Sequence, residues 1–432
     1  MLFKEITIID ENLDAKENMV VGVMNDTITY IGDKLPENLS EYGRVYNGKN
    51  KILMTGLFNA HCHMPMTLLR GYAENLKLQE WLFDKIFPFE AKINHHDSYY
   101  ACLLAIAEMM STGTVSVTDM YAHMNANAMA CADSGFKANL SNGLMAFDDT
   151  PFSENKNHLE EEECALKFKD ITDGRIKFDK SVHAVYTSNR KTVEDVASFA
   201  KENNSIVHIH LSETETEVKE CLEKYGVTPV KYFYDSGLLE SHVVAAHCVW
   251  LTDEDMDILA KTGTFAVHNP ISNLKLASGV ADIPKMQKKG VKIALGTDGT
   301  ASNNNLDLFE EIKVCALINK GVKLNPLLVS TKDVLRYATI NGALAQRRYD
   351  CGALKVGNKA DLIVLDPLSP SMQPVHNACN NLVYSASGRD VCLTMIDGKI
   401  VYENNEFKTI DIERAIYEVN KSASRIKKEL CL

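Results

Sequence analysis

The chain has 432 residues, 45% of them hydrophobic and 24% charged, a composition typical of a soluble globular protein large enough to bury an ample core. This length favours one large domain accompanied by a smaller one. The formal net charge of −12 argues against a nucleic-acid partner, because phosphate binding needs a basic face, and no run approaches the ~18 consecutive apolar residues of a membrane span.

The eleven cysteines are scattered from Cys62 to Cys431 without a CxxC pair. An odd number without a disulfide framework is typical of reduced thiols in the cytosol. The N-terminal sequence MLFKEITIID has acidic residues where a signal peptide has its apolar core. We therefore expect a cytoplasmic protein.

Both ends of the chain predict short strands joined by turns. The first end contains ITIID, MVVGV and TITYIG around Asn25-Asp26, and the last contains ADLIVLD and the hairpin LTMIDGKIVYE around Asp397-Gly398. A final segment, IERAIYEVNKSASRIKKEL, has helical spacing. We expect residues 1–54 and 360–432 to form one small β-sandwich domain.

Between these ends, eight β-rich runs recur, most of them followed by helical patterns. The runs are ILMTGLFNAH, TVSVTD, KANLSNGL, IKFDKSVH, IVHIHLS, VVAAHC, TFAVHN and VKIALGTD, and the helical pattern after the first is DSYYACLLAIAEMMST. This order over residues 55–359 predicts an α/β fold of the TIM type, a (β/α)8 barrel that would be the catalytic domain. A doubly wound open sheet is the alternative, but no G-x-G-x-x-G or Walker loop supports it.

Polar residues end these runs, where a barrel places its active site. His61 and His63 end the first run; two residues apart on a strand, they share a face and can reach one ion. Cys62 between them should point to the opposite face. A chance pair of histidines at the start of a loop is the alternative.

Later runs end in the same types of residue. His210 ends the fifth run, followed by Glu213, whose carboxylate could reach over a metal-bound water; His247 ends the sixth run and Asp298 the eighth. Taken singly, Glu213 could be a first-turn helix residue and Asp298 a helix cap. Convergence from four strands favours a metal site with three histidines and an aspartate as ligands. We interpret His208, one layer deeper, as a packed structural histidine.

These residues stand in motifs that resemble those of a known family. The motifs are, in order, GLFNAHCHMPMTLLRGYAENL, HAVYT, HIHLSETETEV, AAHCVWL, HNPISNLKLASG, LGTDGTASNN and MQPVHN. They are similar to the amidohydrolase superfamily and, within it, to the 5-methylthioadenosine/S-adenosylhomocysteine deaminases, over nearly the whole chain. The resemblance implies hydrolytic deamination of the adenine ring of a nucleoside (5′-methylthioadenosine, adenosine or S-adenosylhomocysteine) to the inosine analogue and ammonia.

The resemblance also implies a ligand set and catalytic roles. One divalent metal, Zn2+ in the first place with Fe2+ or Mn2+ as alternatives, would be held by His61, His63, His210 and Asp298. Glu213 would shuttle a proton to the ring nitrogen, His247 would orient the attacking water, and Asp298 would take the water's proton.

Further residues match the family's substrate contacts. Besides Glu213, these are Glu90, which would accept hydrogen bonds from the ribose hydroxyls, His183, and Trp81 beside the purine. We assign Tyr186, three residues after His183, to a loop rather than to the substrate. The resemblance further suggests a homo-oligomer.

One departure from other branches concerns a carboxylated lysine that bridges two metals on the fourth strand. Here that strand ends in His183, and Lys180, three residues earlier, should face away from the side of His183. We therefore expect a mononuclear site, with Lys180 on the surface or the barrel wall. We expect the acidic run EEEC near Glu161 to be solvated.

A second departure concerns the amino-acid tail of S-adenosylhomocysteine. Relatives that accept this substrate hold its carboxylate with arginines, one of which would align near Asn142, whereas this chain has no arginine between Arg70 and Arg175. A bidentate guanidinium clamp is a strong charge-assisted contact, and Lys156 would replace it less specifically. We expect adenosine or 5′-methylthioadenosine to be preferred.

Two other functions stay open from the sequence. A related amidohydrolase could act on another base or ring, as guanine or cytosine deaminases and triazine hydrolases do, but a bare base has no ribose for Glu90 to hold. A structural protein that has lost its ligands is disfavoured because the ligand set is complete. The expected partner is a small nucleoside, with no nucleic acid and no membrane.

Overall fold

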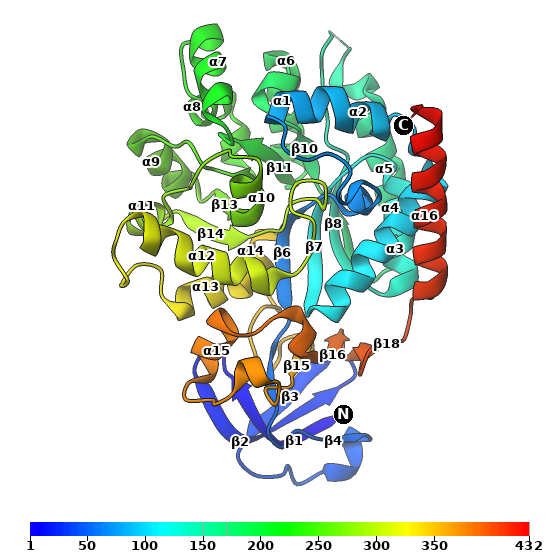
Figure 1. The fold of residues 1–432 in the computed structure, drawn as a ribbon, viewed down its shortest axis with the longest axis vertical. Coiled ribbons are helices and arrows are strands. Elements are labelled where there is room, and N and C mark those ends of the chain that lie inside the picture. Colours follow the sequence, from blue (N-terminus) through cyan, green and yellow to red (C-terminus); the bar gives the residue numbers. More distant parts are fainter. Residues whose placement is uncertain (149, 170, 432) are drawn as a thin grey trace.

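The computed structural model describes residues 1–148, 150–169 and 171–431. It has two parts, a barrel surrounded by helices and a smaller β-sheet beneath it that both ends of the chain build (Figure 1). No described helix is long and apolar enough to cross a membrane.

The barrel consists, within the described residues, of eight parallel strands in sequence order. They are β6 (Leu57–Cys62), β7 (Thr114–Met120), β8 (Lys137–Ser141), the two-part strand β9 (Ile176–Phe178) and β10 (Lys180–Val182), β11 (Ile206–Leu211), β12 (His242–His247), β13 (Phe265–His268) and β14 (Lys292–Leu295). β9 pairs with β8 and β10 with β11, and between them the Asp179 amide donates to the Leu140 carbonyl at 2.8 Å. The ring closes where the Asp298 amide donates to the His61 carbonyl at 3.0 Å. The predicted (β/α)8 barrel is confirmed.

Helices follow the strands and cover the outside of the barrel (Figure 1). They are α3 (His95–Ser111), α4 (Met124–Ser134), α5 (Lys156–Phe168), α6 (Arg190–Glu202), α7 (Glu215–Tyr225), α8 (Pro229–Asp235), α9 (Asp253–Thr262), α10 (Pro270–Lys275), α11 (Ile283–Lys288), α12 (Leu308–Val322), α13 (Thr331–Ala338) and α14 (Ile340–Ala345). α3 is the helix predicted after the first strand, and it begins with a capping box between Asn94 and Asp97. The predicted C-terminal helix, α16 (Ile412–Glu429), lies along α3, where Arg425 pairs with Asp97.

The small domain is built on one sheet of nine strands among the described residues. They are β1 (Leu2–Ile9), β2 (Ala15–Met24), β3 (Thr27–Gly32), β4 (Val45–Asn47), β5 (Ile52–Thr55), β15 (Leu362–Leu365), β16 (Val391–Ile396), β17 (Lys399–Glu403) and β18 (Glu406–Phe407), with α15 (Ala378–Tyr384) between β15 and β16. Both predicted hairpin turns are present, and they touch: a Cβ on Gly398 (φ +71°) would lie 1.8 Å from the Asn25 carbonyl oxygen. Glycine is required there by both its backbone conformation and this contact.

The first predicted β-run, ILMTGLFNAH, is two strands rather than one. β5 belongs to the small sheet and β6 to the barrel, with Gly56 between them. A Cβ on Gly56 would lie 2.3 Å from the Val115 side chain, so the chain passes from one sheet to the other where no side chain fits.

Lys180 is on the barrel wall, one of the two positions expected for it, whereas the expectation that the acidic run is solvated is wrong for Glu161. Lys180 lies buried between β10 and α5, where its Nζ donates to Glu161 at 3.0 Å and to Glu162 at 2.6 Å. Glu161 is buried too, and its other oxygen accepts the Asn142 amide at 2.9 Å. Glu161 of α5 packs inward because the lysine supplies the opposite charge, whereas its neighbour Glu163 is exposed.

Candidate active site

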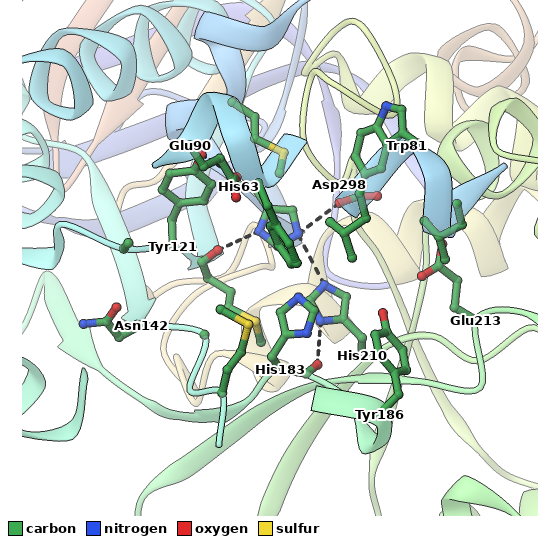
Figure 2. A pocket seen from close by; sticks show the side chains of 18 of the residues that line it. His63, Trp81, Glu90, Tyr121, Asn142, His183, Tyr186, His210, Glu213 and Asp298 are labelled. Atoms are coloured by element: carbon green, nitrogen blue, oxygen red, sulfur yellow. Dashed lines mark hydrogen bonds and ion pairs between the residues drawn. The ribbon is translucent and has the colours of Figure 1, made fainter. Parts of the chain in front are cut away.

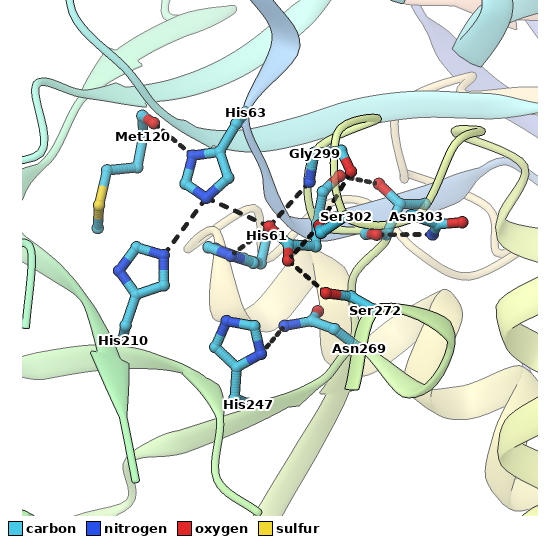
Figure 3. A network of polar contacts seen from close by, with 12 residues as sticks. His61, His63, Met120, His210, His247, Asn269, Ser272, Gly299, Ser302 and Asn303 are labelled. Carbon is cyan, nitrogen blue, oxygen red and sulfur yellow. Dashed lines mark hydrogen bonds and ion pairs between the residues drawn. The ribbon is translucent and has the colours of Figure 1, made fainter. Parts of the chain in front are cut away.

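Four side chains from three strands converge at the carboxyl end of the barrel (Figure 2 and Figure 3). His61 is the next-to-last residue of β6 and His63 follows the strand, His210 is on β11, and Asp298 follows β14. The Nε2 atoms of His61 and His63 lie 3.3 and 3.2 Å from Asp298 Oδ1, and His210 Nε2 lies 3.3 Å from His63 Nε2. The sequence-predicted ligand set is therefore brought to one point.

Backbone carbonyls orient two of these rings. The Nδ1 atom of His63 lies 2.6 Å from the Met120 carbonyl oxygen, and that of His210 lies 2.7 Å from the His183 carbonyl oxygen. A carbonyl accepts a hydrogen bond only from a protonated Nδ1, so each Nε2 is left to face the centre. This second shell of contacts fixes the ring orientation that a metal ligand needs.

His208 orients the ring of His61 in the same way, through a hydrogen bond to its Nδ1. Its Nε2 atom lies 2.8 Å from His61 Nδ1, and both rings are fully buried. The predicted structural histidine is therefore packed against a site residue. His61 Nε2 is buried without a well-formed hydrogen bond among the described residues, although buried nitrogens are normally paired.

Asp298 is held by several donors. Its Oδ2 accepts the hydroxyls of Ser272 at 2.6 Å and Ser302 at 2.8 Å, and its Oδ1 accepts the Gly299 amide at 2.8 Å. Its backbone has φ +61°, which turns the side chain inward at the end of the strand. Burial acts to raise the pKa of Asp298, but the hydrogen bonds and charges of His61 and His63 outweigh it and hold the pKa well below the usual value.

The cluster attracts positive charge. Burial acts to lower the pKa of His63, yet the Asp298 carboxylate and the Met120 carbonyl raise it to about 9. Two overlapping groups of donors, His61 with His63 and Asp298, and His61 with His210 and His247, each bring their ligand atoms within 4.8 Å of one another. The His61 nitrogen without a hydrogen bond belongs to both groups, and this combination of imidazoles and a carboxylate fits a divalent transition metal. The structure therefore agrees with the predicted metal site.

Glu213 and His247 lie beside this cluster. Glu213 follows β11, is buried, and accepts a hydrogen bond from Ser278 Oγ at 3.1 Å. His247 ends β12 with φ +74°; its Nε2 lies 3.8 Å from Glu213 Oε2, and its Nδ1 lies 2.9 Å from Asn273 Oδ1. Burial raises the pKa of Glu213, although His247 opposes this, so a proton is retained on the carboxyl more readily than in water.

Glu217 is a residue that the sequence reasoning missed. It is buried on the first turn of α7, and its two carboxyl oxygens accept the amides of Ser212 at 2.9 Å and Glu213 at 2.8 Å. It thereby fixes the turn that carries Glu213. The signal was available, because Thr214 and Glu217 have the S/T-x-x-E spacing of a capping box.

A cavity of about 280 Å³ opens above the cluster. Its wall includes Trp81, on the π-helical turn η3 (Trp81–Ile86), and Glu90, at the end of α2 (Phe87–Glu90), with α1 (Leu78–Glu80) just before them. In Figure 2, His63, His210 and Asp298 lie centrally, with Trp81 and Glu213 on one side and Asn142 on the other.

Glu90 is the acidic group on the upper wall. Tyr121, which the sequence reasoning did not single out, donates its hydroxyl to Glu90 Oε1 at 2.6 Å. Burial raises the pKa of Glu90 to about 7, although the Tyr121 hydrogen bond acts to lower it. His183 also lines the cavity, where its Nδ1 lies 3.0 Å from Thr187 Oγ1. Tyr186 lines it too, from the 3-10 turn η5 (Val185–Thr187) in the loop to which the sequence assigned it.

The Asn142 side of the cavity has no basic side chain to hold a carboxylate. Asn142 Nδ2 donates to Glu160 at 2.8 Å, and no lysine or arginine lines the cavity within the described ranges. Lys156, the expected substitute, begins α5 on the exposed surface and is not part of the wall.

Comparisons with known proteins agree with this geometry. The Amidohydrolase family model matches residues 52–401. The chain is 41% identical over 430 residues to a 5-methylthioadenosine/S-adenosylhomocysteine deaminase of Thermoanaerobacter pseudethanolicus, and the match covers 99% of each chain. It is also 41% identical to a 5′-deoxyadenosine deaminase of Methanosarcina acetivorans, with 96% of this chain and 95% of that one covered. A solved adenosine deaminase from Xanthomonas campestris with bound zinc superposes with a TM-score of 0.92 at 31% identity, covering 99% and 98%. The resemblance expected from the motifs is confirmed, and the chain belongs to the amidohydrolase family.

Proposed function

We propose that this chain is a metal-dependent hydrolase that deaminates the adenine ring of a small nucleoside, giving the inosine analogue and ammonia. The observation that carries this proposal is the cavity itself: it places a buried acid/base pair, Glu213 and His247, beside the donor cluster and a carboxylate, Glu90, on its upper wall. The names of the relatives, which are adenine-nucleoside deaminases, support the same conclusion.

His61, His63, His210 and Asp298 would hold one divalent metal. Zinc is the ion we propose, because three imidazoles and a carboxylate suit it and the similar adenosine deaminase contains zinc. When bound, such an ion lowers the pKa of water enough to supply a nucleophile near neutral pH. The position of Lys180, on the barrel wall with its Nζ paired with Glu161 of α5, supports a single ion.

Protein side chains then donate and accept the protons that the reaction moves. Hydrolysis adds water at C6 of adenine and expels ammonia, so N1 and the leaving amino group must each receive a proton. Glu213, whose pKa is raised by burial, donates the proton to N1 as a general acid. Asp298 accepts the proton of the attacking water and passes it to the leaving amino group, while Glu213 regains a proton from the C6 hydroxyl as ammonia leaves. His247, whose Nε2 lies 3.8 Å from Glu213 Oε2, orients the attacking water.

The substrate's sugar and tail fit the rest of the wall. Trp81 would pack beside the purine, His183 would contact the substrate, and Glu90 would accept hydrogen bonds from the ribose hydroxyls. The 5′ substituent would extend toward Asn142 and the Met145 side chain. Because no cation lines this side within the described residues, we propose that a neutral 5′ group is preferred over the charged tail of S-adenosylhomocysteine.

We also propose a division of labour along the chain. Residues 55–359 form the catalytic barrel, and residues 1–54 and 360–432 form the supporting domain, whose last helix, α16, braces the barrel through α3. The eleven cysteines are free thiols, which supports a reducing, cytoplasmic location.

The first test is ammonia release from zinc-loaded protein. The substrates are adenosine, 5′-methylthioadenosine, 5′-deoxyadenosine, S-adenosylhomocysteine, guanine and cytosine. We expect turnover of the nucleosides but of neither free base, with kcat/KM about tenfold or more higher for 5′-methylthioadenosine than for S-adenosylhomocysteine, since a missing charge-assisted contact has about this effect. Equal values for these two would refute the proposed preference. No turnover of any nucleoside, with metal bound, would refute the function.

Glu213→Gln tests the proton donor. We expect metal content to stay at the wild-type level while kcat falls about 10²- to 10⁴-fold, the usual contribution of general acid/base catalysis. The control is Glu215→Gln, two residues away on the exposed face of α7, which should leave kcat unchanged. A Glu213→Gln enzyme with near-normal kcat would remove Glu213 from the mechanism.

Glu217→Ala tests the positioning of Glu213. Loss of its carboxylate leaves the Ser212 and Glu213 amides buried without acceptors, so the turn should shift. We expect kcat to fall as much as about a hundredfold with a smaller change in KM and unchanged metal content. Glu217→Gln, which keeps one acceptor oxygen, should recover part of the activity. If both variants keep the wild-type kcat, Glu217 has no positioning role.

The pH profile tests Glu90. Its pKa of about 7 lies above the usual value, so the carboxylate that accepts ribose hydroxyls predominates only above that pH. We expect kcat/KM for nucleosides to rise with pH through about 7. The Glu90→Gln enzyme should lack this limb, and Tyr121→Phe, which removes the hydrogen bond that lowers the pKa, should move it to higher pH. The same limb in the Glu90→Gln enzyme would assign it to another group.

A further inference from the structure

A second cavity, of about 320 Å³, lies at the opposite end of the barrel. Its walls come from the amino-terminal ends of barrel strands, where Lys137 begins β8 and Lys177 is on β9, and from the hairpin turns of the small sheet, where Asp26 and Asp397 lie. It therefore sits between the barrel and the small domain, away from Asp298 and the other groups at the carboxyl ends of the strands.

The walls of this second cavity are basic, although the chain as a whole is acidic. Cations outnumber carboxylates along it; the cations are Lys137, Arg175, Lys177, Arg347, Arg348, Lys359 and Lys399, and the carboxylates are Asp26, Asp173, Asp350 and Asp397. In a protein of formal net charge −12, such a local excess of positive charge is unusual.

Only two of these cations are neutralised by direct pairing among the described residues. Lys137 pairs with Asp361 at 2.5 Å and with Asp397 at 2.7 Å, and Lys359 pairs with Asp26. The remaining five have no carboxylate within 4 Å in the described ranges. Two of the four carboxylates of the second cavity, Asp26 and Asp397, are thus committed to these lysines, whereas Asp173 and Asp350 pair with no cation within 4 Å in the described ranges.

Two guanidinium groups are particularly short of acceptors. Arg348 is 5% exposed; one of its terminal nitrogens donates to the carbonyls of Ala138 and Arg175 and to Asn139 Oδ1, but its buried Nε–H has no acceptor among the described residues. The Nε–H of Arg175 is also buried without an acceptor in the described part of the chain. Beside them, burial and the Arg348 charge lower the pKa of Lys177 to about 8. Cations that are not paired therefore outnumber the unpaired carboxylates, Asp173 and Asp350, on the described walls of this cavity.

We propose that the second cavity binds a phosphate-type oxyanion. Guanidinium groups match the tetrahedral oxygens of phosphate in geometry and charge, and lysines add point charges around them. Arg175 and Arg348 would face the ion from the barrel, and Lys399, on the exposed start of β17, from the small sheet. The ion would thereby join the two domains. Inorganic phosphate and the phosphate group of a small metabolite share this chemistry.

The test is calorimetric titration of the zinc-loaded full-length protein with inorganic phosphate. We expect saturable binding at millimolar concentration or below, weakened about tenfold or more in Arg175→Gln and in Lys399→Gln, because each removes a charge-assisted contact. Lys313→Gln, an exposed lysine on α12, is the control and should bind as the wild type does. Affinity should fall as ionic strength rises, and phosphate should raise the Tm of the wild-type protein more than that of Arg175→Gln.

A second titration, with adenosine 5′-phosphate and with a sugar phosphate, distinguishes free phosphate from a phosphorylated metabolite as the ligand. Tighter binding than inorganic phosphate, with the same loss in Arg175→Gln, would assign the site to phosphorylated metabolites; weaker binding would assign it to the free ion. No saturable binding of any of the three would overturn the proposal. So would binding that is unchanged in both variants, or that disappears on chelation of the zinc, because phosphate would then occupy the metal centre. Deaminase activity is not used as a readout, so failure here leaves the proposed function intact.

Discussion

The upper rim of the barrel depends on one electrostatic constraint: the Asp298 carboxylate is ionised and buried among imidazoles. A charge at this depth is stable only with close partners. The hydroxyls of Ser272 and Ser302 hold one oxygen, and the nitrogens of His61 and His63 approach the other at 3.3 and 3.2 Å. These nitrogens converge on the same point, where His63 satisfies the carboxylate by holding a proton and His61 Nε2 is left without a hydrogen bond among the described residues. A cation at that point would satisfy the carboxylate and the imidazoles together, which is why we regard the rim as built around a metal.

The backbone prepares this geometry before any ligand arrives. The carbonyls of Met120 and His183 set the rings of His63 and His210, and the left-handed conformation of His247 (φ +74°) turns its ring toward the cavity. A side-chain-bearing residue in that conformation costs about 1 kcal/mol or more, and such strain persists where surrounding contacts hold it. The strand ends therefore position the groups with little freedom left, so little reorganisation is needed when substrate binds.

The fold and the candidate ligand residues could be predicted because both follow from patterns among residues close together in the sequence. Strand periodicity located the barrel strands, and polar residues such as His210, on β11, and Asp298, just beyond β14, stood at their carboxyl ends, where a barrel gathers its polar groups. What could not be predicted depends on distant partners. Glu161 is buried only because Lys180 lies opposite it, and Tyr121 matters only because its hydroxyl reaches Glu90. Neither pair shares a sequence spacing that marks it.

The two ends of the barrel gather side chains that favour ions of opposite charge. At the carboxyl end, a carboxylate and several imidazole nitrogens converge in a way that favours a cation; at the amino end, guanidinium groups such as Arg348 gather in a way that favours an anion. In barrels of this type the first end carries chemistry and the second carries stability. The amino end here is also the contact with the small sheet, through the buried pair of Lys137 and Asp361. An anion bound beside that pair would contact both domains and would therefore affect how firmly they are held together. It would not touch the reacting atoms, because the carboxyl-end cavity lies at the far end of the strands.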